Sequence, residues 1–288
     1  MIFARRHAEL LDCGAFRSLA VLIRPDLRIS VMRSQRLAFD SLLLQSAVGS
    51  DWQRRELSVV LEGRYLVRAG QGLNIEEGSA LLAHQERWNE RWDAQPLRTL
   101  TVEWLGATRR LFGGAAELAI GRRPLARLRA LASRIESGPH TDEREPIARD
   151  ILRELDALGL LQPEDLVLPS LSPPPGAQRL ADAMSRLGCN LAGGPALCDL
   201  EADISRSSRH LRRLTHHFAD WLDTRGLGHR ELLRNRRLVA ATSMLSVAEA
   251  SVPRVAASLG YSGERALRTA LQQAGLGSPS EIRQALAT

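Results

Sequence analysis

The chain has 288 residues, of which 44% are hydrophobic, and its 39 Lys and Arg against 33 Asp and Glu give a formal net charge of +6. That length accommodates about two domains whose cores need no disulfide or metal. Three Cys form no even-numbered disulfide framework, which fits a reducing cytosol. No apolar run reaches the roughly 18 residues of a membrane helix, and the N-terminal MIFARRHAELLDCGAF lacks the features of a signal peptide. We therefore expect a cytoplasmic protein.

The basic excess is concentrated in the C-terminal part of the chain. Residues 177–288 hold 15 Arg against 10 acids, whereas residues 1–176 hold 24 Arg against 23 acids. Residues 206–237 alone carry 9 Arg and 3 acids, which creates the positive field that phosphate binding requires. The chain has no Lys. Arginine suits bidentate contacts with guanine and phosphate, but its exclusive use beside abundant Ala, Leu and Gly is more typical of genomic base composition.

Residues 15–105 contain short β-prone runs separated by glycine turns. The runs are SLAVLIRP, LSVVLEGRYLVRAG, GLNIEEGSALLA and LRTLTVEWL, with turns expected at Gly63, Gly70 to Gly72 and Gly78. Such a series predicts an antiparallel sandwich or barrel. The stretch LEGRYLVRAGQGLNIEEGSALL also resembles the strand-turn-strand of a cupin-like sensory domain. We expect residues 1–105 to form a cupin-like sensory or regulatory β domain.

The N-terminal half carries no pattern typical of a catalytic centre. His7, His84 and His140 are widely scattered, whereas a metal-dependent cupin needs several converging ligands. HExxH, GxSxG and Walker motifs are absent. We expect neither enzyme activity, nor a cofactor, nor a metal ion.

Some residues of this half could still contact a small molecule. Trp88, Trp92 and Trp104 could line a pocket, although packing is the commoner role of such residues. His84 could likewise lie at a barrel mouth or in a solvated loop.

The sequence of residues 106–165 predicts helices. PLARLRALASRIES and EPIARDILRELDALGLL each carry an apolar stripe, formed by Leu125, Leu128, Leu131 and Ala132 in the first and by Ile147, Ile151, Leu155 and Leu158 in the second. We expect residues 106–168 to form a helical coupling or dimerisation segment. The two helices could pack on each other or on a second subunit, and the pattern favours neither.

A proline-rich connector follows. Four prolines and a glycine fall within residues 168–178, which favours an extended linker over residues 169–176. The next segment, RLADAMSRLGCNL, has helical periodicity and predicts the first helix of a C-terminal domain over residues 177–288.

The segment LCDLEADISRSSRHLRRLTHHF predicts a helix, a turn and a second helix. Leu200 and Ile204 share a face of the first helix, and Ser205 and Arg206 fall at the turn. Ser207 suits the N-cap of a helix that starts near Ser208. On that helix one face is apolar, with Leu211, Leu214 and Phe218, and the opposite face is basic, with Arg209, Arg212, Arg213 and His216.

The segment VPRVAASLGYSGERALRTALQQAG repeats this helix-turn-helix pattern. Val255 and Leu259 belong to the first helix, Gly260 supplies a left-handed turn, and Ser262 is the expected N-cap of the second helix. The second helix is expected to bury Leu267, Ala270 and Leu271. Its opposite face holds Arg265, Arg268, Thr269 and Gln272. Each of these four residues follows its counterpart in the first unit by 56 positions, which indicates an internal repeat. Between the units, HRELLRNRRLVAATSMLSV predicts a connecting helix.

The tail from Leu197 to Leu286 resembles the DNA-binding domain of AraC/XylS-type transcription regulators. RLVAATSML stands where that family has its linker helix, and VAASLGYS followed by GSPSEIR is similar to its second-unit signature. The chain departs from the family at Ser205, in the longer segment ADWLDTRGLG, and at Gln272 and Gln273. A cupin-like domain is the family's usual N-terminal partner, so the resemblance implies a multidomain α+β protein whose C-terminal all-α domain has two helix-turn-helix units.

The resemblance implies a sequence-specific regulator that places two recognition helices in successive major grooves about 34 Å apart. Its expected partners are double-stranded DNA, RNA polymerase, an unknown small-molecule effector and a second copy in a homodimer, with no membrane. The expected DNA contacts are Arg206, Ser207, Ser208, Arg209, Arg212, Arg213, Arg234, Arg236, Ser262, Glu264, Arg265, Arg268, Thr269 and Gln272. Arg234 and Arg236 on the connecting helix are expected to contact phosphates.

Two other interpretations remain open, and a third is disfavoured by the spacing of its residues. The chain could be a cupin-type small-molecule enzyme or binding protein with an accessory helical domain that does not bind DNA. The tail could be a protein-docking module, which would agree with Gln272 and Gln273. Cys189, Cys198, His210 and His216 could form a zinc finger, but the two cysteines are spaced too widely for one.

Overall fold

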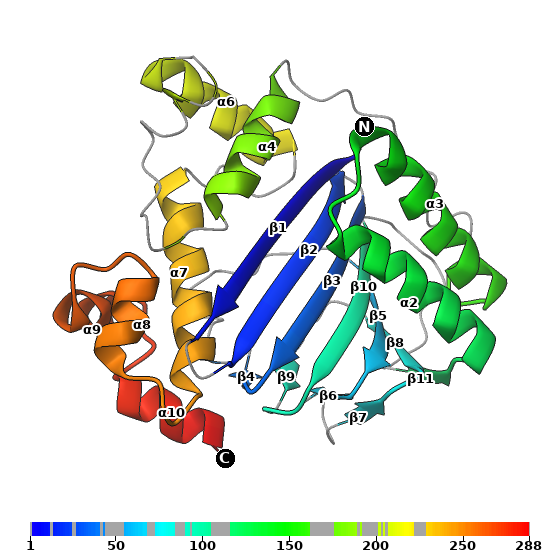
Figure 1. Ribbon diagram of the computed structural model, residues 1–288, viewed down its shortest axis with the longest axis horizontal. Coiled ribbons are helices and arrows are strands. Elements are labelled where there is room, and N and C mark those ends of the chain that lie inside the picture. Colours follow the sequence, from blue (N-terminus) through cyan, green and yellow to red (C-terminus); the bar gives the residue numbers. More distant parts are fainter. Residues whose placement is uncertain are drawn as a thin grey trace.

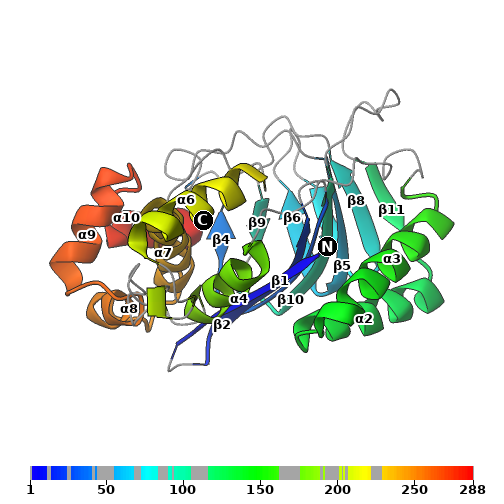
Figure 2. The ribbon, with the colours of Figure 1, turned by 90° about the horizontal axis from the view of Figure 1, so that it is seen from above.

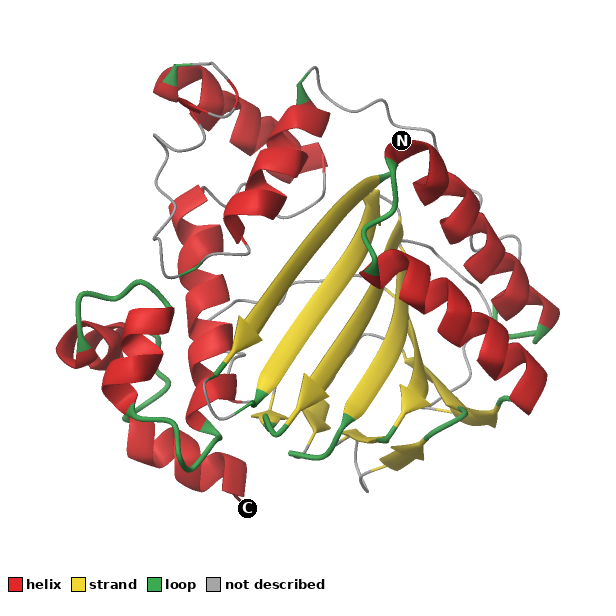
Figure 3. Ribbon diagram, viewed as in Figure 1, coloured by secondary structure: helices red, strands yellow, loops and turns green. Residues whose placement is uncertain are grey.

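In the computed structural model the described residues are 2–11, 14–24, 27–40, 43, 55–67, 73–83, 90–92, 94–104, 116–161, 176–188, 191, 201–202, 204, 207–221 and 229–287. Two antiparallel sheets occupy the middle of the molecule, and helices lie on both sides of them (Figure 3). The multidomain α+β fold class expected from the sequence is confirmed. None of the helices in the described ranges has the length and apolarity needed to span a membrane.

The larger sheet has seven strands in the order β1-β2-β3-β10-β5-β8-β11. Their bounds are β1 Phe3–Leu10, β2 Phe16–Arg24, β3 Leu27–Gln35, β5 Arg55–Glu62, β8 Ser79–Ala83, β10 Leu97–Trp104 and β11 Ala116–Ala119. The smaller sheet has the order β4-β9-β6-β7, with β4 Phe39–Asp40, β9 Glu90–Trp92, β6 Arg64–Val67 and β7 Leu73–Glu76. Gly63, with φ +80°, joins β5 to β6, as the sequence predicted.

Alternation of side chains along β2 gives the large sheet two different faces. Ala20 and Leu22 belong to a core that includes α2 (Arg122–Glu136) and α3 (Thr141–Ala157). The intervening Val21 and Ile23 belong to a separate cluster with helices of the tail. Figures 1 and 2 show α2 and α3 on one face of this sheet and the small sheet toward the other.

A buried arginine ties α2 to the large sheet. Arg98, 4% exposed, donates from Nη2 to Ser133 Oγ and to Glu136 Oε2, each at 2.8 Å. Its Nη1 donates to Glu62 Oε1 at 3.0 Å. Because the guanidinium lies between β10, β5 and α2, these bonds hold the helix in one register on the sheet.

Trp92 and Trp104 are packing residues. Trp92 stacks on Phe39 with ring centroids 4.2 Å apart, in a cluster between the sheets that also contains Val60 and Ile75. Trp104 lies in the core beneath α2 and α3. Trp88 and His84 lie outside the described residues. The packing alternative therefore holds for Trp92 and Trp104.

The tail consists of α4 Ala177–Gly188, α6 Ser208–Trp221, α7 His229–Leu245, α8 Val252–Ser258, α9 Glu264–Gln273 and α10 Pro279–Ala287. It packs on the β domain through two clusters. Val21 and Ile23 of β2 join α4 and α6, through residues such as Leu180, Leu211 and Leu214. Leu11, Ala15 and Leu37 join α7 and the helices that follow it. Hydrophobic packing therefore connects the tail and the β domain.

One element differs from the prediction. The segment 106–165 was expected to be helical throughout, but β11 occupies Ala116–Ala119 and pairs antiparallel with β8. Ala, Glu and Leu have high helix propensity, and pairing at the sheet edge overrides it here. α2 and α3 are as predicted, with the expected residues of both stripes buried or packed against the core. The linker 169–176 lies outside the described residues except for Gly176.

Candidate nucleic-acid interface

The second helix of the first unit has the two faces that its sequence predicted. α6 begins at Ser208, with Leu211 and Leu214 buried on one side. Its opposite side exposes Arg209, Arg212, Arg213 and His216. The side chain of Phe218, predicted to extend the apolar stripe, lies outside the described residues.

The start of the first unit is described only in part. Ile204 is buried in the cluster that contains Leu211, as its spacing predicted. Leu200, Ser205 and Arg206 lie outside the described residues, and Ser207 is exposed just before α6. The Ser208 hydroxyl donates to a carboxylate oxygen of Glu201, a contact between residues seven apart that helical periodicity does not predict. Ser208 is thus already hydrogen-bonded within the unit.

The second unit is described without a gap. Ser251 caps α8 by accepting a hydrogen bond from the Arg254 amide at 3.3 Å. Gly260 adopts φ +73° at the turn, as predicted. α9 then buries Leu267 and Leu271 and exposes Arg265, Arg268, Thr269 and Gln272.

The predicted cap of α9 is wrong by one residue. The N-cap is Gly263 and not Ser262, and no side chain caps the helix. Ser262 is exposed one position earlier. The carboxylate of Glu264 in the first turn instead provides the negative charge that favours a helix N-terminus.

The connecting helix α7 carries arginines in two different environments. Arg234 is exposed, whereas Arg236 is half-buried with its Nε and Nη2 enclosed by protein. Arg237 donates from Nη2 to the Leu191 carbonyl at 3.4 Å and lies 5.7 Å from the centre of the Tyr261 ring. Burial raises the pKa of the Tyr261 phenol, and the charges of Arg237 and Arg234 offset part of that shift. Arg237 therefore connects α7 to the turn of the second unit.

The position of the second unit on α7 is set by further contacts. Arg283 of α10 donates from Nε to the Leu245 carbonyl at 3.2 Å and from Nη2 to the Ala250 carbonyl. Ser258 of α8 contacts Met244 Sδ at 3.5 Å. In Figure 1, α6 lies toward the first end of α7 and α8 to α10 lie beside its second half. α7 thus connects two separately packed units.

Sequence reasoning missed some exposed basic residues near the predicted contacts. Arg230 is exposed on α7 one turn before Arg234, and His217 is exposed beside His216 on α6. Helical spacing alone could have found Arg230, because residues four apart share a helix face.

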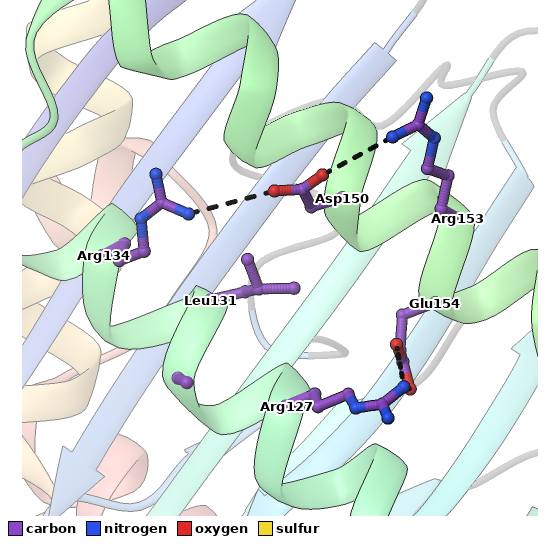
Figure 4. Close-up of a pocket in the computed structure, with 7 residues that line it drawn as sticks. Arg127, Leu131, Arg134, Asp150, Arg153 and Glu154 are labelled. Atoms are coloured by element: carbon purple, nitrogen blue, oxygen red, sulfur yellow. Dashed lines mark hydrogen bonds and ion pairs between the residues drawn. The ribbon is translucent and has the colours of Figure 1, made fainter.

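A second surface feature lies on α2 and α3, in the segment predicted to couple or dimerise. A groove of about 460 Å³ is lined by Arg127, Ala130, Leu131, Arg134, Asp150, Arg153 and Glu154. Arg127 pairs with Glu154 at 3.3 Å, and Arg134 and Arg153 each lie 3.9 Å from Asp150 (Figure 4). Because its arginines are paired with Asp150 and Glu154, this groove offers little net positive field.

The described part of the chain contains no group of three or more His, Cys, Asp and Glu side chains that could hold a metal ion. His140 lies at the N-cap of α3, where its backbone amide donates to Glu143. Cys189 and Cys198, the cysteines of the zinc-finger alternative, lie outside the described residues. His210 and His216, the other two residues of that alternative, lie on α6.

No protein-family model and no curated protein matches this sequence. Solved structures similar to it include ToxT from Vibrio cholerae, with 10% identity and a TM-score of 0.36 over 91% of this chain and 100% of that one. Another is CuxR, described as an AraC-like transcriptional activator, with 13% identity and a TM-score of 0.34 over 82% of this chain and 86% of that one. The EutQ protein of Clostridium difficile matches 33% of this chain and 69% of its own, with 15% identity and a TM-score of 0.25. Similarity at this level assigns no function.

Proposed function

We propose that this protein is a sequence-specific DNA-binding transcription regulator of the AraC/XylS type. The observation that carries the proposal is the repeated pair of helices in which α6 and α9 each bury leucines and expose arginines at matching positions. A short helix of this kind fits the major groove, where arginine donates to the N7 and O6 of guanine. Two such helices joined by α7 suit two successive major grooves.

The two units differ in the charge that their second helices expose. α6 exposes Arg209, Arg212 and Arg213, whereas α9 exposes Arg265 and Arg268 and also carries Glu264. Arg230 and Arg234 extend the basic surface along α7. Because phosphate contacts supply most non-specific affinity, we assign the larger share of that affinity to α6 and α7.

The β domain is the proposed receptor for a small-molecule effector. On the face of the large sheet turned toward the small one, a row of polar side chains crosses β3, β10 and β5. Ser58 Oγ lies 2.9 Å from Thr101 Oγ1 and 2.8 Å from Glu56 Oε1. Arg28 pairs with Glu103 at 3.3 Å. Such partly buried polar groups could orient a polar ligand, and a cupin-type binding protein that does not bind DNA would use the same row.

Dimerisation and contact with RNA polymerase are further parts of the proposal. The paired charges of the groove between α2 and α3 give that surface both signs, which suits contact with a second copy of itself about a two-fold axis. The protein is proposed to act in the cytoplasm, without catalytic activity.

Selection from randomised duplex DNA by the full-length protein tests the proposal. Enrichment of a sequence is expected, and Arg212→Ala combined with Arg213→Ala should weaken binding to it by roughly 2 to 5 kcal/mol in an anisotropy titration at fixed salt. The matched control is Arg122→Ala with Arg123→Ala, which removes two exposed arginines from α2 and should leave affinity nearly unchanged. Failure to enrich any sequence, or equal losses in the two double variants, would contradict the proposal.

A further inference from the structure

The exposed face of α9 carries an ion pair that neutralises one of its two arginines. Arg268 donates to Glu264 Oε1 from Nε at 2.8 Å and from Nη2 at 2.5 Å. Both bonds end on Oε1, and neither uses Oε2. The side chains remain 48% and 36% exposed, so the pair lies at the surface that the unit would present to DNA.

A carboxylate in this position is unfavourable for simple phosphate binding. It lies one helical turn before Arg268 at the N-terminal end of α9, and it would be repelled by the DNA backbone. An ion pair between residues i and i+4 stabilises a helix by only about 0.3 to 0.5 kcal/mol. The charge that Glu264 places at the helix N-terminus adds a contribution of similar size. Neither contribution involves Glu264 Oε2, which stays available for a role toward the bases.

The pair presents hydrogen-bonding groups in a fixed order. The Nη1 and Nη2 edge of Arg268 offers donors, and beside it Glu264 Oε2 offers an acceptor. In the major groove a G·C pair presents the N7 and O6 acceptors of guanine followed by the N4 amino donor of cytosine. The two orders are complementary. An A·T pair would instead place the O4 acceptor of thymine toward the carboxylate, which is repulsive.

We infer that Glu264 and Arg268 act together to read one G·C base pair in the half-site of α9, with Arg268 on guanine and Glu264 on cytosine. The inference rests on the proposed DNA binding and adds to it a base preference and a division of labour. α9 with its paired charges discriminates between sequences, and the exposed arginine face of α6 supplies affinity. Glu264 is a specificity residue that excludes wrong bases as well as accepting the right one.

The experiment uses the full-length protein and the duplex enriched from the randomised library. The half-site that keeps its sequence preference in Arg212→Ala/Arg213→Ala belongs to α9. Within it, one G·C pair should be preferred over A·T by about five- to 150-fold in competition binding. Glu264→Gln should reduce that preference at least about fivefold, because an amide can donate to thymine O4 as well as accept from cytosine N4, while leaving preferences elsewhere unchanged. Arg268→Lys should also weaken the guanine preference, because an ammonium lacks the planar fork.

The matched control is Glu249→Gln. Glu249 lies in the turn between α7 and α8 and pairs with Arg36 at 3.1 Å, so this change also removes one negative charge and breaks one exposed ion pair. The base preferences of the Glu249→Gln variant should equal those of the parent protein. If Glu264→Gln weakens G·C and A·T duplexes by the same factor, the pair only stabilises the helix and the inference is wrong. If the parent protein enriches no sequence, the proposed function itself fails, and the inference fails with it.

Discussion

Arg17 of β2 donates from Nη1 to the Ser243 hydroxyl of α7 at 3.0 Å, and both residues are buried. Ser243 Oγ in turn donates to the Val239 carbonyl at 3.2 Å, so the hydroxyl both accepts and donates. The Arg17 guanidinium also lies 5.9 Å from the centre of the Phe39 ring. The sheet is therefore bonded directly to the helix that connects the two helical units of the tail.

Arg17→Ala should lower the free energy of unfolding by about 1.5 to 3 kcal/mol, because a buried hydrogen bond from a charged donor is lost. Urea denaturation of both proteins measures the difference. Glu249→Ala is the control, since it removes the exposed partner of Arg36 and should cost under about 1 kcal/mol. If the two variants lose the same free energy of unfolding, burial of the Arg17 contact adds nothing to stability.

Ile23→Ala should specifically loosen the first unit. Ile23 packs in the cluster that contains Leu180, Leu211 and Leu214, and its truncation should cost about 2 to 4 kcal/mol. Leu22→Ala is the matched control because Leu22 lies on the opposite face of β2, in the core beneath α2 and α3. Hydrogen exchange should show a larger loss of protection in α4 and α6 for Ile23→Ala than for Leu22→Ala. Indistinguishable exchange patterns would contradict the assignment of the two faces.

Glu281 should make the docking of α10 depend on pH. Its carboxylate accepts the Ser278 amide at 2.6 Å, and this bond, with a smaller contribution from the Ser278 side chain, lowers the pKa of Glu281 below its usual 4.5. A lowered folded-state pKa gives stability that is present above the unfolded-state pKa and is lost as pH falls through the folded value. The stability deficit of Glu281→Gln should therefore shrink as pH falls below about 4.5. If the stability difference between the parent protein and Glu281→Gln stays constant from pH 7 to about 3, ionisation of Glu281 contributes nothing to stability.

The periodicity of the sequence predicted the helical tail well. The 3.6-residue repeat placed Leu211 and Leu214 inside and Arg212 and Arg213 outside, and the structure has them so. The repeat in the second unit was equally informative, because Leu267 and Leu271 mark its buried face. The boundary at Ser262 was off by one residue, since Gly263 can also occupy an N-cap and no side-chain bond fixes the choice.

The sheet was less predictable. β1 has the sequence FARRHAEL, which lacks the alternation of apolar residues typical of a half-buried strand, and it forms because β2 pairs with it along its whole length. β11 is short and helix-prone, and its pairing with β8 decides its conformation. The contact between Arg17 and Ser243 joins residues 226 positions apart, so no local pattern could reveal it.

Hydroxyl-radical footprinting of the full-length protein on its enriched duplex tests the central claim most directly. If α6 and α9 enter successive major grooves, the cleavage pattern should show two protected patches on one face of the duplex, with centres about 10 base pairs apart. Arg212→Ala with Arg213→Ala should weaken one patch and Arg265→Ala with Arg268→Ala the other. A single patch, or two patches on opposite faces of the duplex, would contradict binding by two connected helix-turn-helix units.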